Sequence, residues 1–169
     1  MKENDIGLVM EYLKIGLVDI WIDELYATKN EKDGFKYGLE KEELLQIEEL
    51  VKSDEGRTKT IGQFLNEKLY ELQMTQSDVA NRSGLTKGVI SNIINGRHNP
   101  SKYKMVKIAI AMKLDVDETV EFLETMGYKF NKTLKDKIIF ACLNLGITDM
   151  IKIEEALNKV VDANESLFA

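Results

Sequence analysis

The sequence of 169 residues contains one proline, one histidine, one cysteine and one tryptophan. A single cysteine, Cys142, excludes an internal disulfide framework and a cysteine-rich zinc site. With His98 as the one histidine, a histidine-based metal site is not expected either. Charged residues interrupt every apolar run before it reaches membrane-spanning length, and the acidic start MKENDIG is unlike a secretion signal. These features predict a cytoplasmic protein with no metal, cofactor or membrane association.

The residue types needed for catalysis are not grouped in any recognisable pattern. No His/Asp/Ser constellation, metal-ligand cluster or phosphate-binding loop occurs. The acidic residues fit solvated helix faces, His98 fits a surface loop, and Cys142 fits the core of a helix over 133–145. We therefore expect no catalytic residues and a protein that is not an enzyme.

Charge is distributed unevenly along the chain. The formal net charge is -6, but residues 58–113 carry nine basic and three acidic side chains. Residues 1–57 carry a net charge of −7, and residues 114–169 a net charge of −5. A basic segment between two acidic segments is typical of a local binding surface for a polyanion. Chance clustering of solvated charges remains the simpler alternative.

Apolar residues recur at helical spacing nearly throughout, which predicts an all-α fold. Before the basic segment, we expect a helix ended by Gly16, a second helix capped by Asp19, an exposed loop over 29–38 and a charged helix over 40–52. A linker is expected over 53–60. Five short helices should follow, the second capped by Thr75 and the third by Thr86. The fourth of these helices should begin at Ser101 and the fifth at Asp117. Two more helices are expected after them, over about 133–145 and 149–162.

The two ends of the chain resemble each other. YLKIGLVDIWIDEL (12–25) aligns with CLNLGITDMIKIEEAL (142–157), provided that one residue is inserted after Trp21. The alignment predicts that 6–26 and 136–161 adopt the same helical hairpin. Because a helix, a glycine and an Asp cap form a common sequence pattern, coincidence remains an alternative.

Residues 74–101 read MTQSDVANRSGLTKGVISNIINGRHNPS. This stretch resembles the helix-turn-helix of the lambda repressor/Cro class, also called the xenobiotic-response-element type. The resemblance covers about 70 residues and implies a central five-helix DNA-binding domain. The matching positions are Thr75, Gln76, Ala80, Gly84, Thr86, Ile90, Asn95 and Gly96. Independently of the family, Ala80 permits two helices to cross closely and Gly84 permits the turn between them.

The third helix of this motif, 86–95, is expected to enter the major groove. Its apolar face should join the core, while the opposite face carries the candidate base-reading residues Lys87, Ser91 and Asn92. Gly88 on that face departs from the family pattern, because it removes one possible base contact. Leu69 and Ile94 also replace an ion pair found in some relatives.

Three further residues match positions that contact DNA phosphates in the family. Gln76 opens the second helix, and Asn95 and Arg97 lie at the end of the third. Such contacts position a protein on DNA without reading sequence. A helix C-cap remains an alternative role for Asn95.

The sequence therefore predicts three domains: an acidic helical segment over 1–56, a DNA-binding domain over 57–130 and an acidic helical hairpin over 131–169. The leading hypothesis is a sequence-specific transcriptional regulator, a repressor that binds a palindromic operator in double-stranded DNA as a homodimer. The alternative is an antitoxin or phage-defence immunity protein whose acidic flanks bind a protein partner. The apolar stripes of the flanks must pack on the central domain, on each other or on a second subunit.

Overall fold

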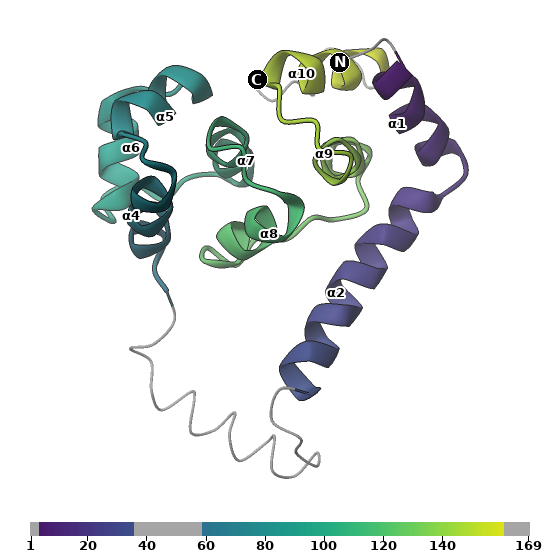
Figure 1. Ribbon diagram of the computed structural model, residues 1–169, viewed down its shortest axis with the longest axis horizontal. Helices are drawn as coiled ribbons and strands as arrows, with labels where there is room; N and C mark the ends of the chain where they lie inside the picture. The colour runs from purple at the N-terminus through teal and green to yellow at the C-terminus, as the bar shows by residue number, and fades with distance from the viewer. Residues whose placement is uncertain (1–3, 36–58, 161–169) are drawn as a thin grey trace.

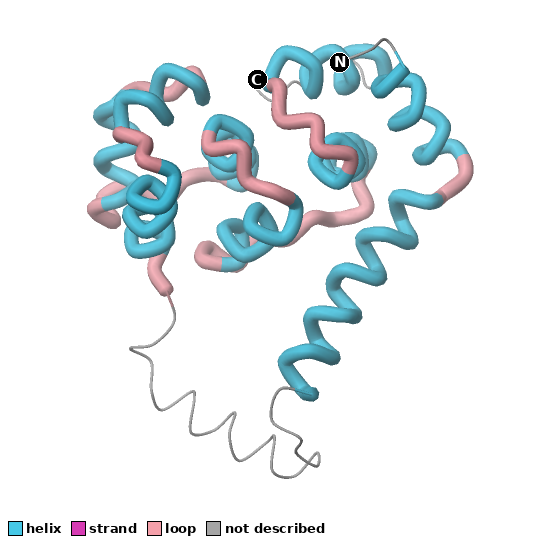
Figure 2. Tube along the Cα trace, in the orientation of Figure 1, coloured by secondary structure: helices cyan, strands magenta, loops and turns pink. Residues whose placement is uncertain are grey.

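The computed structural model describes residues 4–35 and 59–160, and these residues form helices joined by short loops (Figures 1 and 2). The predicted all-α class is confirmed. The predicted helix over 40–52 and most of the linker lie outside the described residues. In chain order the helices are α1 Asn4–Lys14, α2 Leu17–Phe35, α4 Ile61–Leu72, α5 Gln76–Ser83, α6 Lys87–Ile94, α7 Lys102–Ala111, α8 Val116–Glu124, α9 Leu134–Asn144 and α10 Met150–Val160.

Helices α4 to α8, here called the central unit, each begin with a side-chain cap. As predicted, Thr75 and Thr86 accept hydrogen bonds from backbone N–H groups in the first turns of α5 and α6. Ser101, where the fourth helix was expected to begin, caps α7 in the same way. Thr60 caps α4 in the same way. The fifth helix begins earlier than predicted, because Asp115 caps it. Five successive caps fix where these short helices begin.

The core of the central unit is apolar and closely packed. The rings of Phe64 on α4 and Phe122 on α8 are stacked with centroids 5.0 Å apart, and both side chains are almost fully buried. The ring contact therefore joins the first and last helices of the unit. Helix α7 packs against both α5 and α8, which places it in the middle of the unit.

The two ends of the chain pack on each other. Helix α9 contacts α1, α2 and α10, and α1 also contacts α10 (Figure 1). These four helices, here called the flanking unit, share a core that includes Val9, Ile22, Ile139 and Ile153. The unit meets the central unit where α10 contacts α7 and α9 contacts α8. Segments more than 100 residues apart in sequence thus bury their apolar stripes together.

The helical hairpins of the flanking unit have similar turns but begin their second helices differently. Gly16 and Gly146 both adopt left-handed backbone, with φ of 73° and 74°. Helix α10 begins at Met150, and Asp149 accepts a hydrogen bond from the N–H of Ile151. The superposition of the two hairpins stays a prediction.

Two expectations about α2 are wrong. The helix begins at Leu17, so Asp19 lies inside its first turn instead of capping it. The Asp19 carboxylate is 2.9 Å from Nζ of Lys137 on α9, so a tertiary ion pair engages the expected cap residue. The helix also continues to Phe35, through most of the region predicted as a loop.

Buried Asp136 on α9 joins the two units. Its carboxylate accepts hydrogen bonds from Nζ of Lys102, from the hydroxyl of Tyr103 at 2.7 Å and from the N–H of Asn131 at 2.7 Å. Because the carboxylate is fully buried, it needs these partners to offset the loss of water. The contact fixes the first turn of α7 against the beginning of α9.

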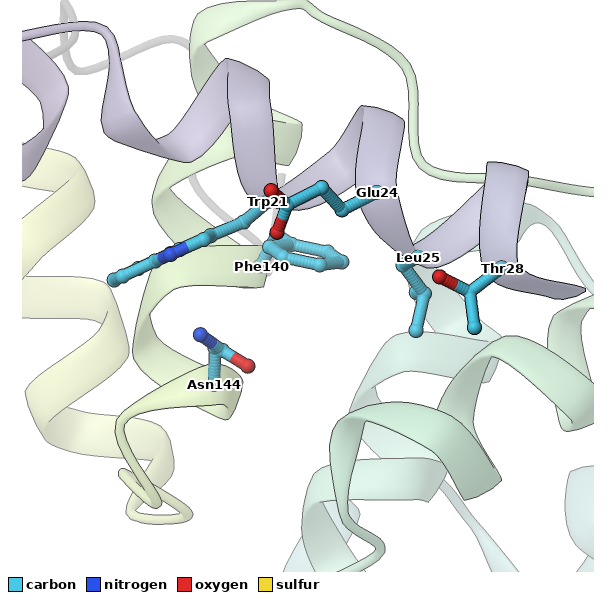
Figure 3. A pocket seen from close by; sticks show the side chains of 6 residues that line it. All are labelled: Trp21, Glu24, Leu25, Thr28, Phe140 and Asn144. Atoms are coloured by element: carbon cyan, nitrogen blue, oxygen red, sulfur yellow. The ribbon is translucent and has the colours of Figure 1, made fainter.

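A groove of about 250 Å³ lies between α2 and α9 (Figure 3). Trp21 and Leu25 of α2 line it together with Phe140 and Asn144 of α9. Trp21 also makes an edge-on ring contact with Tyr12, with centroids 5.2 Å apart.

Cys142 is buried in α9 as predicted, and burial raises the pKa of its thiol to about 12. Among the described residues, every helix is too short or too polar to cross a membrane.

Candidate nucleic-acid interface

The start of α5 is fixed by a reciprocal pair of hydrogen bonds. Thr75 Oγ1 accepts from the N–H of Asp78 at 3.1 Å, and Asp78 Oδ2 accepts from the N–H of Thr75 at 2.8 Å. The backbone hydrogen bond from Thr75 holds the pKa of the Asp78 carboxyl below its usual value. Gln76, the first residue of α5, is half-buried next to this cap. The cap therefore fixes the backbone from which the Gln76 side chain extends.

The turn between α5 and α6 depends on two small residues. Gly84 adopts left-handed backbone with φ of 74°, a conformation that favours glycine. The buried Ser83 hydroxyl donates to the carbonyl of Ala80 and accepts from the N–H of Leu85, both at 3.3 Å. Ser83 therefore satisfies backbone groups at the turn and fixes the direction in which α6 leaves it.

One face of α6 is held in the core. Ile90 and Ile93 are almost fully buried, and α6 packs on both α4 and α5. The approach to α4 is very close at Gly62, where an added Cβ would lie 2.2 Å from the carbonyl oxygen of Ile94. Only glycine fits this crossing, so Gly62 fixes the separation between α4 and the end of α6.

The opposite face of α6 is polar and open. Lys87, Gly88 and Asn92 are exposed, and Ser91 is half-buried. Because these positions are spaced by three or four residues, they form one stripe along the helix. A Cβ added at Gly88 would meet nothing closer than Thr86 Oγ1, at 3.9 Å. The glycine is thus not required by packing and leaves a gap in the polar stripe.

Asn95 is the C-cap of α6 and extends the same stripe. Its side-chain Nδ2 donates to Oγ of Ser91 at 3.4 Å. Left-handed Gly96 then turns the chain, and the N–H groups of Arg97 and His98 both donate to the carbonyl of Asn92. The residues after α6 are therefore tied to its last turn, with Arg97 exposed and His98 half-buried.

The structure brings four of the six predicted site residues together on α6 and its C-cap: Lys87, Ser91, Asn92 and Asn95. Arg97 follows two residues later, and Gln76 stands at the start of α5, which packs on α6. Such a surface can donate hydrogen bonds to an anion and attract it with positive charge. The Ser and Asn oxygens can also accept hydrogen bonds. Its assignment to bases and phosphates stays a prediction.

Several residues that position this surface were missed in the sequence. Asp78 was recognisable, because a Thr followed three residues later by an acidic residue is a known cap signature. Ser83 and Gly62 carry no such signal, because their roles depend on a turn and a helix crossing. Asp136 looked like one more acidic residue of a charged flank. Its role appears only when α9 is placed against α7.

Comparisons with known proteins agree with this geometry. The helix-turn-helix family matches residues 67–118, which include α5, α6, α7 and part of α4 and α8. The chain is 30% identical over 74 residues to the ImmF control region 10 kDa protein of Bacillus phage phi105. The similar region is 41% of this chain and 82% of that protein. No solved structure matches the chain. This chain belongs to the lambda repressor/Cro-like helix-turn-helix family of DNA-binding regulators.

Proposed function

We propose that this protein is a sequence-specific transcriptional repressor that reads the major groove of DNA with α6 and its caps, residues 86–95. The observation that carries the proposal is the two-sided character of α6. Its apolar face is buried while its polar face remains open. Side chains on that face do not hold the fold together, so they are available to base edges. An α-helix fits the major groove.

Base reading is assigned to Asn92, Lys87 and Ser91. The amide of Asn92 can make two hydrogen bonds to adenine, and Lys87 can donate to guanine. Ser91 is weaker as a reader, because the amide of Asn95 already donates to its hydroxyl. Asn92 is therefore expected to contribute the largest share of sequence preference.

Phosphate contacts are assigned to Gln76, Asn95 and Arg97. They lie before and after the reading stripe, at the start of α5 and at the end of α6. This arrangement suits contacts to the backbone on both sides of a groove. The name of the phage relative refers to a control region, which supports a regulatory role for this chain as well.

We further propose that the protein acts in the cytoplasm as a homodimer on a palindromic operator. One helix-turn-helix reads only a short half-site, and dimers gain specificity from two half-sites about one helical turn apart. The flanking unit carries apolar side chains that remain exposed, among them Ile15, Ile20 and Ile151. These side chains could contribute to a symmetric interface.

Binding-site selection from random DNA, followed by competition binding with the full chain, tests the proposal. Asn92→Ala should weaken binding to the preferred site by about 1–3 kcal/mol and relax preference at one base position. Arg97→Ala and Gln76→Ala serve as matched controls, because they should weaken all sequences alike. An unchanged preference after Asn92→Ala would show that α6 does not read the bases.

A further inference from the structure

We propose that the groove between α2 and α9 is a binding site for a small organic cation, an ammonium group attached to a single ring or a short apolar chain. The groove belongs to the flanking unit, whereas α6 belongs to the central unit. A site here gives the protein a second ligand and does not depend on how α6 contacts DNA.

The apolar walls of the groove are held in place by ring contacts outside it. Trp21 of α2 is partly buried and makes its edge-on contact with Tyr12. Phe140 of α9 is almost fully buried and makes a similar contact with Phe130, with centroids 5.4 Å apart. Because packing already orders both rings, a ligand would lose little free energy in ordering them.

Polar side chains reach the groove from both helices. Glu24 and Thr28 of α2 and Asn144 of α9 all line it (Figure 3). In Figure 3 the Trp21 ring is seen nearly edge-on, with one of its faces turned toward Asn144. The oxygens of Thr28 and Asn144 can accept hydrogen bonds from an ammonium group. The groove therefore combines an aromatic face with several hydrogen-bond acceptors.

Glu24 gives the groove its charge, because it is the one ionisable residue among the six that line it. Other carboxylates of α2 are already engaged by lysines. Asp19 is paired with Lys137. Asp23 is paired with Lys132. Within the part of the chain that the structure describes, Glu24 has no such ion pair. Its carboxylate therefore remains available to a cation from solution.

A carboxylate close to an aromatic ring favours a positively charged ligand. Trp21 and Glu24 are three residues apart, so they lie on one face of α2. Tryptophan is the side chain whose ring attracts a cation most strongly. The segments 1–57 and 114–169, which supply the two helices, carry net charges of −7 and −5. Their field attracts cations and repels anions.

The size of the groove limits the ligand. Its volume of about 250 Å³ is below the range of about 300–1,000 Å³ that is typical of sites for drug-sized molecules. Leu25 and Phe140 offer apolar surface to the uncharged part of the ligand. A primary amine that carries one ring matches this combination of size, charge and apolar surface.

Trp21 makes the proposal directly measurable, because it is the one tryptophan of the chain. Titration of the full chain with phenethylamine, a cation at neutral pH, should change the tryptophan fluorescence until one site per chain is filled. 2-Phenylethanol carries a hydroxyl in place of the ammonium group, and 3-phenylpropionate carries a negative charge. We expect both to bind at least about tenfold more weakly than phenethylamine.

A pair of charge-removing variants tests whether Glu24 is responsible. Glu24→Gln should weaken phenethylamine binding about fivefold to tenfold and leave 2-phenylethanol binding unchanged. Glu155→Gln removes the same charge at an exposed position on α10 outside the groove. This matched control should bind phenethylamine as the unmodified chain does.

Three results would overturn the proposal. The first is the absence of a saturable change in Trp21 fluorescence with phenethylamine. The second is equal affinity for phenethylamine and 2-phenylethanol, which would mean that the charge is not recognised. The third is an equal loss in Glu24→Gln and Glu155→Gln, which would mean that only the overall charge matters. All three would leave the proposed DNA-binding function standing, because that function is tested by the base preference of Asn92→Ala.

Discussion

The central and flanking units use polar side chains in different ways. In the central unit, small polar residues cap five successive short helices and leave the outer face of α6 open. In the flanking unit, an expected cap residue, Asp19, instead forms an ion pair with another helix. The comparison indicates that the central unit's helix boundaries are set locally. At Asp19 of the flanking unit, a contact between distant segments replaces the expected local cap.

The two units also differ in charge, and they meet through opposite charges. The segment 58–113 has an excess of basic residues, while both outer segments are acidic. At the junction, Lys102 of the basic segment donates to Asp136 of the acidic one. The acidic flanks thus do not simply oppose the basic segment, because one of their carboxylates positions α7.

Removal of the Asp136 carboxylate is expected to have the largest effect on stability. Asp136→Ala leaves Lys102, Tyr103 and the N–H of Asn131 without their acceptor, so unfolding should become easier by about 3–5 kcal/mol. The matched control is Asp23→Ala, which breaks the exposed pair between Asp23 and Lys132 and should cost at most about 1 kcal/mol. Urea unfolding of both variants measures the difference. Equal losses would show that the junction is not a special contact.

The next largest effect is expected at the crossing of α4 and α6. Gly62→Ala forces a methyl group onto the carbonyl oxygen of Ile94, so the helices must separate at a cost of about 1–3 kcal/mol. Gly88→Ala places the same methyl group in open space and should stabilise α6 by up to about 1 kcal/mol. Thermal unfolding should therefore shift in opposite directions for the two variants. Shifts of the same sign would contradict this account of the central unit.

The smallest effect concerns the acid stability of the central unit. Although burial alone would raise the pKa of Glu118, the backbone hydrogen bond from Asp115 and the pair with Lys68 lower it overall. Because the folded pKa is lower than the unfolded one, the contribution of Glu118 to stability is present above the unfolded pKa. It is lost as the pH falls through the folded pKa.

Melting temperatures measured from neutral pH to about pH 3 should therefore fall less steeply in Glu118→Gln than in the unmodified chain. Glu121→Gln, at an exposed position on the same helix, is the matched control and should follow the unmodified chain. If the two variants behaved alike, the pair with Lys68 would not contribute to acid stability.

The sequence alone determined the fold class and the boundaries of α5 and α6. Thr75, Thr86 and Gly84 act through hydrogen bonds and backbone angles within a few residues of themselves, so their roles can be read without the rest of the chain. The burial of Ile90 and Ile93 follows from helical spacing in the same way. For this reason the candidate reading face could be predicted before the fold was known.

Only the tertiary structure decided which flank packs on which, and what holds α7 and α9 together. The apolar stripes of α1, α2, α9 and α10 are compatible with several partners, because hydrophobic burial is not directional. In the sequence Asp136 is indistinguishable from a solvated acidic residue, whereas in the structure Lys102 and Tyr103 donate hydrogen bonds to it. In the sequence Gly62 only lowers the helix propensity of its segment, whereas in the structure it makes room for the backbone of Ile94. In each case the deciding contact joins residues more than 30 positions apart, so no local pattern could contain it.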